Sequence, residues 1–312
     1  MSVDPNLQSK AAGRQAHRKP LTYFGGVTLV VLAGTFWSTM GIGIRLIENA
    51  NVWQILFYRS LALAVLLFTL ISFRSGHQPL RCIKASGIAG VIGGLGLVIA
   101  FSGGVYAIQT TTVANAMFLF ASTPFFAALL GLVLLKEQVR TGTWIAIALA
   151  MVGIVLMVRQ GISMGHMIGN MTALLSALGF AIFTIALRWK RLQDMFPAVF
   201  LAGIFSTALC FFMILFNQQE LILTPRDTLI AIFLGFFLVG IGLAIYTIGS
   251  KVVPAVELAL LSMTEVLLGP VWVWLFLGET ANVNTLIGGA ILLLAIVWNA
   301  LSGMKRKPVP TL

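Results

Sequence analysis

Acidic residues are scarce in this sequence. Its 312 residues include only 9 Asp and Glu against 20 Lys and Arg, and charged residues make up 9% of the chain. Soluble domains carry roughly 25% charged residues, so a chain that is 59% hydrophobic is excluded from that class. The net charge of +11 would favour nucleic acid if it gathered on one folded face. The basic residues lie instead in short breaks between apolar runs, which indicates membrane topology and no nucleic-acid partner.

Cysteine and histidine are also scarce. Cys82 and Cys210 lie in or beside apolar segments and suggest no disulfide framework. His17, His77 and His166 fall in the tail and loops, so the apolar runs hold no histidine for a Ser-His dyad or a metal cluster. A Gly-Lys-Ser/Thr phosphate loop is absent too, which argues against ATP-driven pumping by this chain alone. We therefore expect no enzyme, no cofactor and no metal. A membrane enzyme and a purely structural membrane protein stay as rival hypotheses.

Long apolar runs follow one another along the chain. A spanning helix needs roughly 20 apolar residues, and the sequence predicts an all-α membrane protein with ten transmembrane helices. The expected spans are 21–46, 52–73, 83–108, 112–135, 143–158, 167–187, 196–216, 228–249, 255–277 and 284–301. The connections are short, so consecutive helices run antiparallel and leave no room for a channel-type filter loop.

The basic residues predict the orientation. With the N-terminus inside, the cytoplasmic side receives sixteen Lys and Arg, the outer side receives Arg45, Arg159 and Arg226, and Arg59 falls within the second span. This bias predicts that both termini are cytoplasmic. We expect the protein to lie in the inner (plasma) membrane of the cell. Residues 1–20 lack an apolar core, so they predict a disordered cytoplasmic tail rather than a signal peptide. Residues 304–312 predict a basic cytoplasmic tail.

The two halves of the chain match when it is shifted by 142 residues. Lys136 and Glu137 then fall on Gly278 and Glu279, and the hydropathy agrees over five spans. A repeat with an odd number of spans enters the membrane upside down the second time. The sequence thus predicts two inverted five-helix repeats, 21–161 and 162–303, which is typical of transporters that alternate access around a midplane site.

The pairs Lys136-Glu137 and Gly278-Glu279, each closing a fourth helix, give the chain its family resemblance. It resembles the drug/metabolite transporter superfamily, specifically the EamA-type repeat, over residues 21 to about 302. That repeat commonly has a Glu-Pro step about fourteen residues before a Gly-Glu pair. The first half instead has Ser122-Thr123-Pro124, and the second has Met263-Thr264-Glu265 with no proline directly after the glutamate.

Within the superfamily, Trp37-Ser38-Thr39-Met40 looks like the first helix of YddG-like bacterial amino-acid exporters. The resemblance implies export of amino acids, aromatic ones included, or of related metabolites, by alternating access through a central cavity. Other members move sugar phosphates, nucleotide sugars or cationic drugs, so superfamily membership leaves the solute open. We expect a monomer whose partners are its small-molecule substrate and the lipid bilayer.

Helix breakers are the candidate hinges. Pro124 falls in the fourth span and Gly269-Pro270 in the ninth, which are equivalent helices of the two repeats. A proline removes one backbone hydrogen bond and kinks the helix; a static kink that only aids packing is the alternative. Glycines crowd the third and eighth spans, where small residues let helix backbones approach closely.

Ionisable residues inside a membrane are costly, at roughly 2.5 kcal/mol or more at the helix centre. Glu265, in the ninth span, could receive a substrate ammonium or carry a coupling proton; neutralisation by hydrogen bonding is the alternative. Arg59 could meet a substrate carboxylate or could snorkel to the outer headgroups. Glu137 and Glu279 lie at helix ends, where we expect them to cap or pair.

Aromatic side chains offer stacking and cation–π surfaces to a solute that carries a ring or a positive charge. Each one alone is more often core or lipid-facing, so the group carries the hypothesis. Asn115 adds an uncharged donor and acceptor for a zwitterion. The full set of candidate substrate-binding residues is Trp37, Ser38, Thr39, Arg59, Phe101, Tyr106, Asn115, Phe118, Tyr246, Glu265 and Trp272.

Overall fold

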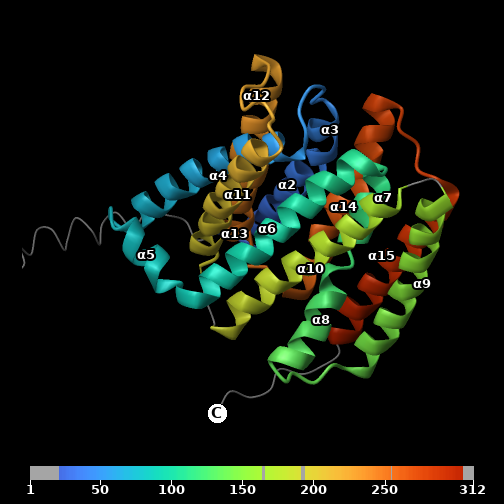
Figure 1. Ribbon diagram of the computed structural model, residues 1–312. Coiled ribbons are helices and arrows are strands. Elements are labelled where there is room, and N and C mark those ends of the chain that lie inside the picture. Colours follow the sequence, from blue (N-terminus) through green and yellow to red (C-terminus); the bar gives the residue numbers. More distant parts are fainter. Residues whose placement is uncertain (1–20, 164–165, 191–193, 254, 305–312) are drawn as a thin grey trace, which may run out of the picture.

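The computed structural model describes residues 21–163, 166–190, 194–253 and 255–304 (Figure 1). The tails expected at 1–20 and at 305–312 lie outside the described residues. Helices are the only regular secondary structure in the described part of the chain. Nine helical stretches there are long and apolar enough to cross a membrane, and Leu261–Leu277 is a shorter apolar stretch.

The helices form an antiparallel bundle. Their bounds are α2 Tyr23–Ser38, α3 Met40–Arg45, α4 Val52–Arg74, α5 Pro79–Ala85, α6 Gly87–Thr110, α7 Val113–Phe120, α8 Thr123–Leu134, α9 Thr141–Ser163, α10 Met167–Trp189, α11 Phe196–Phe216, α12 Pro225–Phe233, the π-helix η1 Leu234–Ile241, α13 Gly242–Gly249, α14 Ala255–Leu277 and α15 Val283–Met304.

Short polar caps start several of these helices. At α4 the Asn51 side chain accepts hydrogen bonds from the backbone N–H groups of Trp53 and Gln54, and Gln54 Oε1 accepts one from the Asn51 N–H. Thr112 caps α7, and Thr224 caps α12 just before Pro225. These side chains satisfy backbone donors that have no partner within the helix, so they fix where each span begins.

The third span begins later than the sequence predicts. The expected run 83–108 is divided: α5 ends at Ala85, and α6 begins at Gly87. Gly87 has a φ of +55°, a conformation that glycine adopts without steric cost, and this residue separates the two helices.

Glycines bring α6 and α10 into direct backbone contact. A Cβ at Gly96 would lie 2.8 Å from the Gly179 carbonyl oxygen, and one at Gly103 would lie 2.6 Å from that of Thr172. Ser176 Oγ donates a hydrogen bond of 2.6 Å to the Ala100 carbonyl across the same contact. The predicted role of the third-span glycines in close packing is therefore seen, and it fastens one half of the chain to the other.

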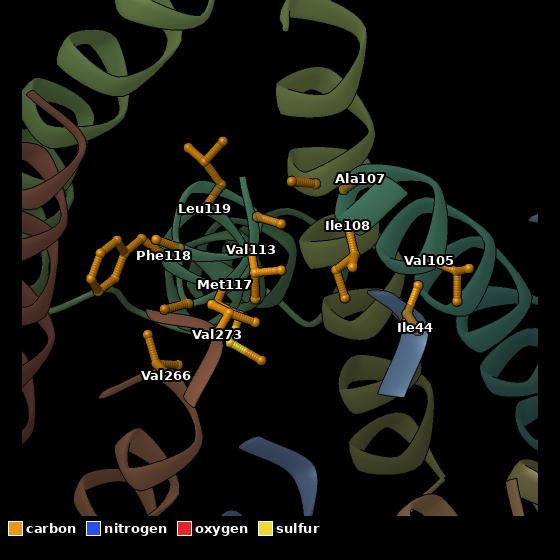
Figure 2. Close-up of a cluster of buried hydrophobic side chains, with 14 of the residues drawn as sticks. Ile44, Val105, Ala107, Ile108, Val113, Met117, Phe118, Leu119, Val266 and Val273 are labelled. Atoms are coloured by element: carbon orange, nitrogen blue, oxygen red, sulfur yellow. The ribbon is translucent and has the colours of Figure 1, made fainter. Parts of the chain in front are cut away.

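The helix α7 lies at the centre of the larger hydrophobic core (Figure 2). Figure 2 shows its Val113, Met117 and Leu119 side chains, with Val266 and Val273 of α14 next to Met117. Phe118 points away from them. The helix α7 is almost fully buried, and it contacts both α14 and Gly41 of α3.

Candidate functional site

The first span is broken at Thr39, between α2 and α3. The Thr39 N–H donates to the Phe36 carbonyl at 3.2 Å, and the Thr39 and Ser38 hydroxyls donate to the carbonyls of Phe36 and Thr35 at 2.7 and 2.6 Å. Ser and Thr hydroxyls that bond nearby carbonyls compete with the regular helix. The break therefore follows directly from the Trp37-Ser38-Thr39 sequence.

Trp37, just before the break, packs on Tyr246 of α13. The two ring centroids are 5.4 Å apart and the ring planes are inclined by 41°. Gly242 makes room for the indole, because a Cβ there would lie 2.6 Å from Trp37 Nε1. The two rings form a half-buried apolar surface with polar edges.

Trp272 of α14 reaches the same break from the other side. Its Nε1 donates a hydrogen bond of 2.8 Å to Ser38 Oγ. One turn earlier on α14, Gly269 lies against the Met117 side chain of α7. A Cβ added to Gly269 would lie 3.5 Å from the Ser38 carbonyl oxygen. The structure thus brings Trp37, Ser38, Tyr246 and Trp272 together, and we call these four residues the break cluster.

Glu265 lies on the same face of α14 as Gly269 and Trp272, because residues four and seven apart share a helix face. Its backbone N is 3.6 Å from the position of a Cβ on Gly34 of α2, so α14 is tightly packed on α2 at this level. The carboxyl is half-buried and makes no hydrogen bond or ion pair with any other described residue. The neutralising hydrogen bond that was the alternative to a functional role is therefore not seen within the described residues.

Arg59 does not reach the outer surface, so the snorkelling alternative is wrong. Its side chain is only 4% exposed, and its guanidinium carbon lies 4.5 Å from the centroid of the Phe101 ring. Nε and Nη2 have no hydrogen-bond partner among the described residues. A desolvated cation on an aromatic face is stabilised by about 2 kcal/mol, less than its loss of hydration costs.

Other predicted residues lie apart from the break cluster. Asn115 Nδ2 donates to Asn170 Oδ1 and Thr111 Oγ1, and its Oδ1 lies 3.5 Å from the Thr285 hydroxyl, so protein groups already use its amide. Phe118 packs against Gly289 of α15. A role for either residue in solute binding stays a prediction, and the observed contacts are those of helix packing.

Thr39 and Tyr106 are also separate from the cluster. Thr39 lines an apolar groove of about 580 Å³ between α3 and the α12–η1 segment, together with Gly43 and Phe237. Tyr106 packs on the larger core from α6. The groove has almost no polar lining and offers nothing to a polar solute.

The two predicted hinges differ. Pro124 lies at the start of α8, after α7 has ended at Phe120, so the fourth span is truly divided. Pro270 lies inside α14, which continues to Leu277, so the ninth span is not divided as the fourth is, and a hinge at Gly269-Pro270 stays a prediction. A proline inside a helix still leaves one carbonyl without its N–H partner and weakens the helix there.

The sequence reading missed one feature, the π-helix η1 in the eighth span. It runs from Leu234 to Ile241, and Gly242 of α13 follows it beside Trp37. Gly235 within it lies directly against the backbone of Arg59. π-Helical turns are frequent at functional sites, and the crowd of glycines in this span was the only signal for it.

Two ion pairs lie at opposite ends of the bundle. Arg45 Nε is 3.1 Å from Glu279 Oε2, and Arg188 Nη2 is 2.8 Å from Glu137 Oε1. Glu279 Oε1 also accepts a hydrogen bond of 2.6 Å from the Val113 N–H at the start of α7. The expectation that both glutamates pair is confirmed.

The glutamates of these two ion pairs correspond under the sequence shift of 142 residues, and Arg188 lies one residue beyond the position that corresponds to Arg45. Each glutamate follows a residue with positive φ, Lys136 at +55° and Gly278 at +66°. Each glutamate N–H also donates to the carbonyl six residues earlier. The two turns therefore have the same local geometry. The described residues contain no group of three or more His, Cys, Asp or Glu that could hold a metal ion.

Comparison of the sequence with known proteins identifies its family. The sequence profile of the EamA-like transporter family matches the chain twice, over residues 24–159 and 167–301. An uncharacterized transporter of Clostridium kluyveri is 22% identical, and the match covers 90% of this chain and 94% of that protein. The pseudopaline exporter of Pseudomonas aeruginosa is 24% identical over 90% of this chain and 97% of its own length.

A biotin transporter of Salmonella typhimurium is 26% identical, over 76% of this chain and 79% of its own length. One crystal structure is 16% identical and superposes with a TM-score of 0.61 over 91% of this chain and 100% of its own. That likeness supports the fold. The relatives' names indicate membrane transport of small molecules by multi-pass proteins.

Proposed function

The chain belongs to the EamA-like transporter family, and from this premise we propose that it is an inner-membrane secondary transporter that exports amino acids, aromatic ones included, or related small metabolites. The observation that carries the proposal is the break cluster. It joins the Trp37–Tyr246 ring pair, the Ser38 hydroxyl and the Trp272 indole from three spans, and Glu265, whose carboxyl has no partner among the described residues, lies on the same face of α14 as Trp272.

The proposed architecture is ten transmembrane helices in two inverted repeats, 21–161 and 162–303, with both termini cytoplasmic. The double match of the family profile supports two repeats. The 23-residue helix α14, which is the ninth span in chain order, brings the nine candidate spans to ten. Sixteen basic residues on one side against three on the other support the orientation.

Alternating access is the proposed mechanism. The Arg45–Glu279 pair joins the first and ninth spans at the proposed outer end, and the Arg188–Glu137 pair joins the sixth and fourth at the inner end. Each pair thus connects the first helix of one repeat to the fourth helix of the other. A carrier with inverted repeats opens one side by the motion that closes the other, so each pair is suited to hold one side shut.

Flux through the purified protein tests this function. In proteoliposomes we expect exchange of at least one labelled amino acid above that of empty vesicles, with Trp37→Ala and Glu265→Gln each reduced about tenfold or more. Trp274→Ala and Glu220→Gln, at exposed positions, are the matched controls. Absence of flux across amino acids, sugars and nucleotide sugars would contradict transport; flux of sugar phosphates, nucleotide sugars or cationic drugs alone would replace the amino acid.

A further inference from the structure

Arg59 is the one described arginine that is buried, and it has no carboxylate partner among the described residues. The four ion pairs among the described residues use Arg45, Arg74, Arg188 and Arg226, all with partly exposed side chains. Arg59 is 4% exposed and has none of these pairs. A buried charge without a counter-charge costs several kcal/mol, so its presence needs a compensating role.

Three other helical elements lie around Arg59 of α4. The Phe101 ring of α6 lies under the guanidinium, Gly235 of η1 lies against the Arg59 carbonyl, and the thiol of Cys210 from α11 is its nearest titratable neighbour. A neutral thiol is a weak hydrogen-bond acceptor and cannot balance the charge. The described protein groups around Arg59 therefore provide no anion.

Other buried polar atoms without partners lie on the helices that pack around Arg59. Besides Arg59 Nε and Nη2, the hydroxyls of Ser60, Ser102 and Ser206 are buried without partners among the described residues. Ser60 and Ser102 directly follow Arg59 and Phe101 in the sequence. Phe101 is half-buried and packs against both hydrophobic core clusters, so it lies where the two cores meet.

We propose that Arg59 binds the anionic group of the transported solute, and that the solute class is therefore one with an oxyanion, a carboxylate or a phosphate. The inference rests on the proposed transport function and narrows its substrate. Two guanidinium N–H groups in a fixed plane match two oxygens of such a group. Arg59 lies seven residues beyond the start of α4, which at 1.5 Å per residue is about 10 Å inside the bundle.

Ligand-induced stabilisation of the purified full chain tests the proposal. The probes are L-phenylalanine, its methyl ester, phenethylamine and 3-phenylpropionate, with glucose 6-phosphate against glucose as the phosphate pair. We expect an acid or the phosphate to raise the melting temperature and its counterpart without the oxyanion to bind about tenfold more weakly or worse, as for the loss of a charge-assisted hydrogen bond. The acid arm and the phosphate arm distinguish the two oxyanions.

Variants separate binding from folding. Arg59→Gln should remove the preference for the charged probe, Arg59→Lys should keep part of it, and Arg81→Gln, an exposed arginine of α5, should keep all of it. Arg59→Met should not lower the melting temperature of the ligand-free protein, because it removes an unpaired buried charge. A purely structural arginine would instead lower it.

Three results would overturn the inference: equal binding of the probes with an oxyanion and their counterparts without one by the unaltered protein, an unchanged preference in Arg59→Gln, or no stabilisation by any probe that carries an oxyanion. The first comparison needs no variant, so misfolding cannot hide the answer. Flux of neutral or cationic solutes alone would sink the oxyanion while leaving transport intact, whereas absence of all flux would sink the proposed function itself.

Discussion

At the scale of single residues, Ser38 is the point where the first and ninth spans are joined. Its hydroxyl donates to the Thr35 carbonyl and accepts from Trp272 Nε1, so one oxygen both breaks α2 and holds α14. The hydroxyl therefore uses its one donor and one of its two acceptor positions. Opening a solute pathway between α2 and α14 would have to break the Trp272 contact.

We predict that Trp272→Phe and Ser38→Ala each destabilise the closed form by about 1 kcal/mol, the usual value of one hydrogen bond. The double variant should cost little more than either one, because the two residues share one bond. The measurement is the unfolding midpoint in nanodiscs, with Trp298→Phe on the exposed side of α15 as control. Fully additive losses would show that the bond contributes nothing.

Residue roles were only partly predictable from the sequence. Trp37 and Ser38 belong to one short motif, and Trp272 is an aromatic residue in the ninth span, so the sequence alone made all three candidates. Asn115 is different: its partners Asn170 and Thr285 are 55 and 170 residues away, so its amide network could not be seen before the helices were packed. The burial of Arg59 likewise depends on α6 and α11 and not on its own neighbours.

At the scale of helices, hydropathy located the spans well. The second was expected at 52–73 and is Val52–Arg74, and the seventh, 196–216, agrees with Phe196–Phe216. Interruptions were harder to predict: the Thr39 break comes from hydroxyls that bond carbonyls, and the π-helix η1 accompanies glycines that press on α4. Both depend on backbone hydrogen bonding, which apolar composition does not encode.

The two ion pairs give a prediction about helix ends. Glu279→Gln should loosen the outer end, and Glu137→Gln the inner end. The outer change should have the larger effect, because Glu279 also accepts from Val113 N–H and its side chain is 20% exposed against 43% for Glu137. Exposed pairs contribute only about 0–1 kcal/mol.

The opening of each end is measured by thiol labelling of Ser38→Cys, in a background that also carries Cys82→Ser and Cys210→Ser. An impermeant maleimide should react faster from outside in Glu279→Gln and faster from inside in Glu137→Gln. Exchanging the charges of Arg45 and Glu279 should slow labelling only in part, because an arginine at position 279 cannot accept the Val113 N–H. Equal labelling from both sides in both variants would show that the pairs do not control access.

At the scale of the whole molecule, the orientation of the chain in the membrane determines which of the two equivalent ends is the outer one. The Glu137 and Glu279 turns have the same backbone geometry at the two ends of one bundle, and the bias of basic residues predicts which end is cytoplasmic. If the chain inserted in both orientations, neither ion pair would always lie on the outer side, and a single copy would have no fixed direction of export.

We predict a single orientation with both termini inside, because sixteen basic residues lie on one side and three on the other. Cysteines at Gln78, between α4 and α5, and at Glu220, between α11 and α12, report on opposite sides, and both positions are exposed. In intact cells a membrane-impermeant thiol reagent should label Glu220→Cys and leave Gln78→Cys unmodified until the membrane is opened. The reverse pattern would invert the assignment of the two ion pairs, and partial labelling of both would indicate dual topology, in which case a fixed direction of export would have to be given up.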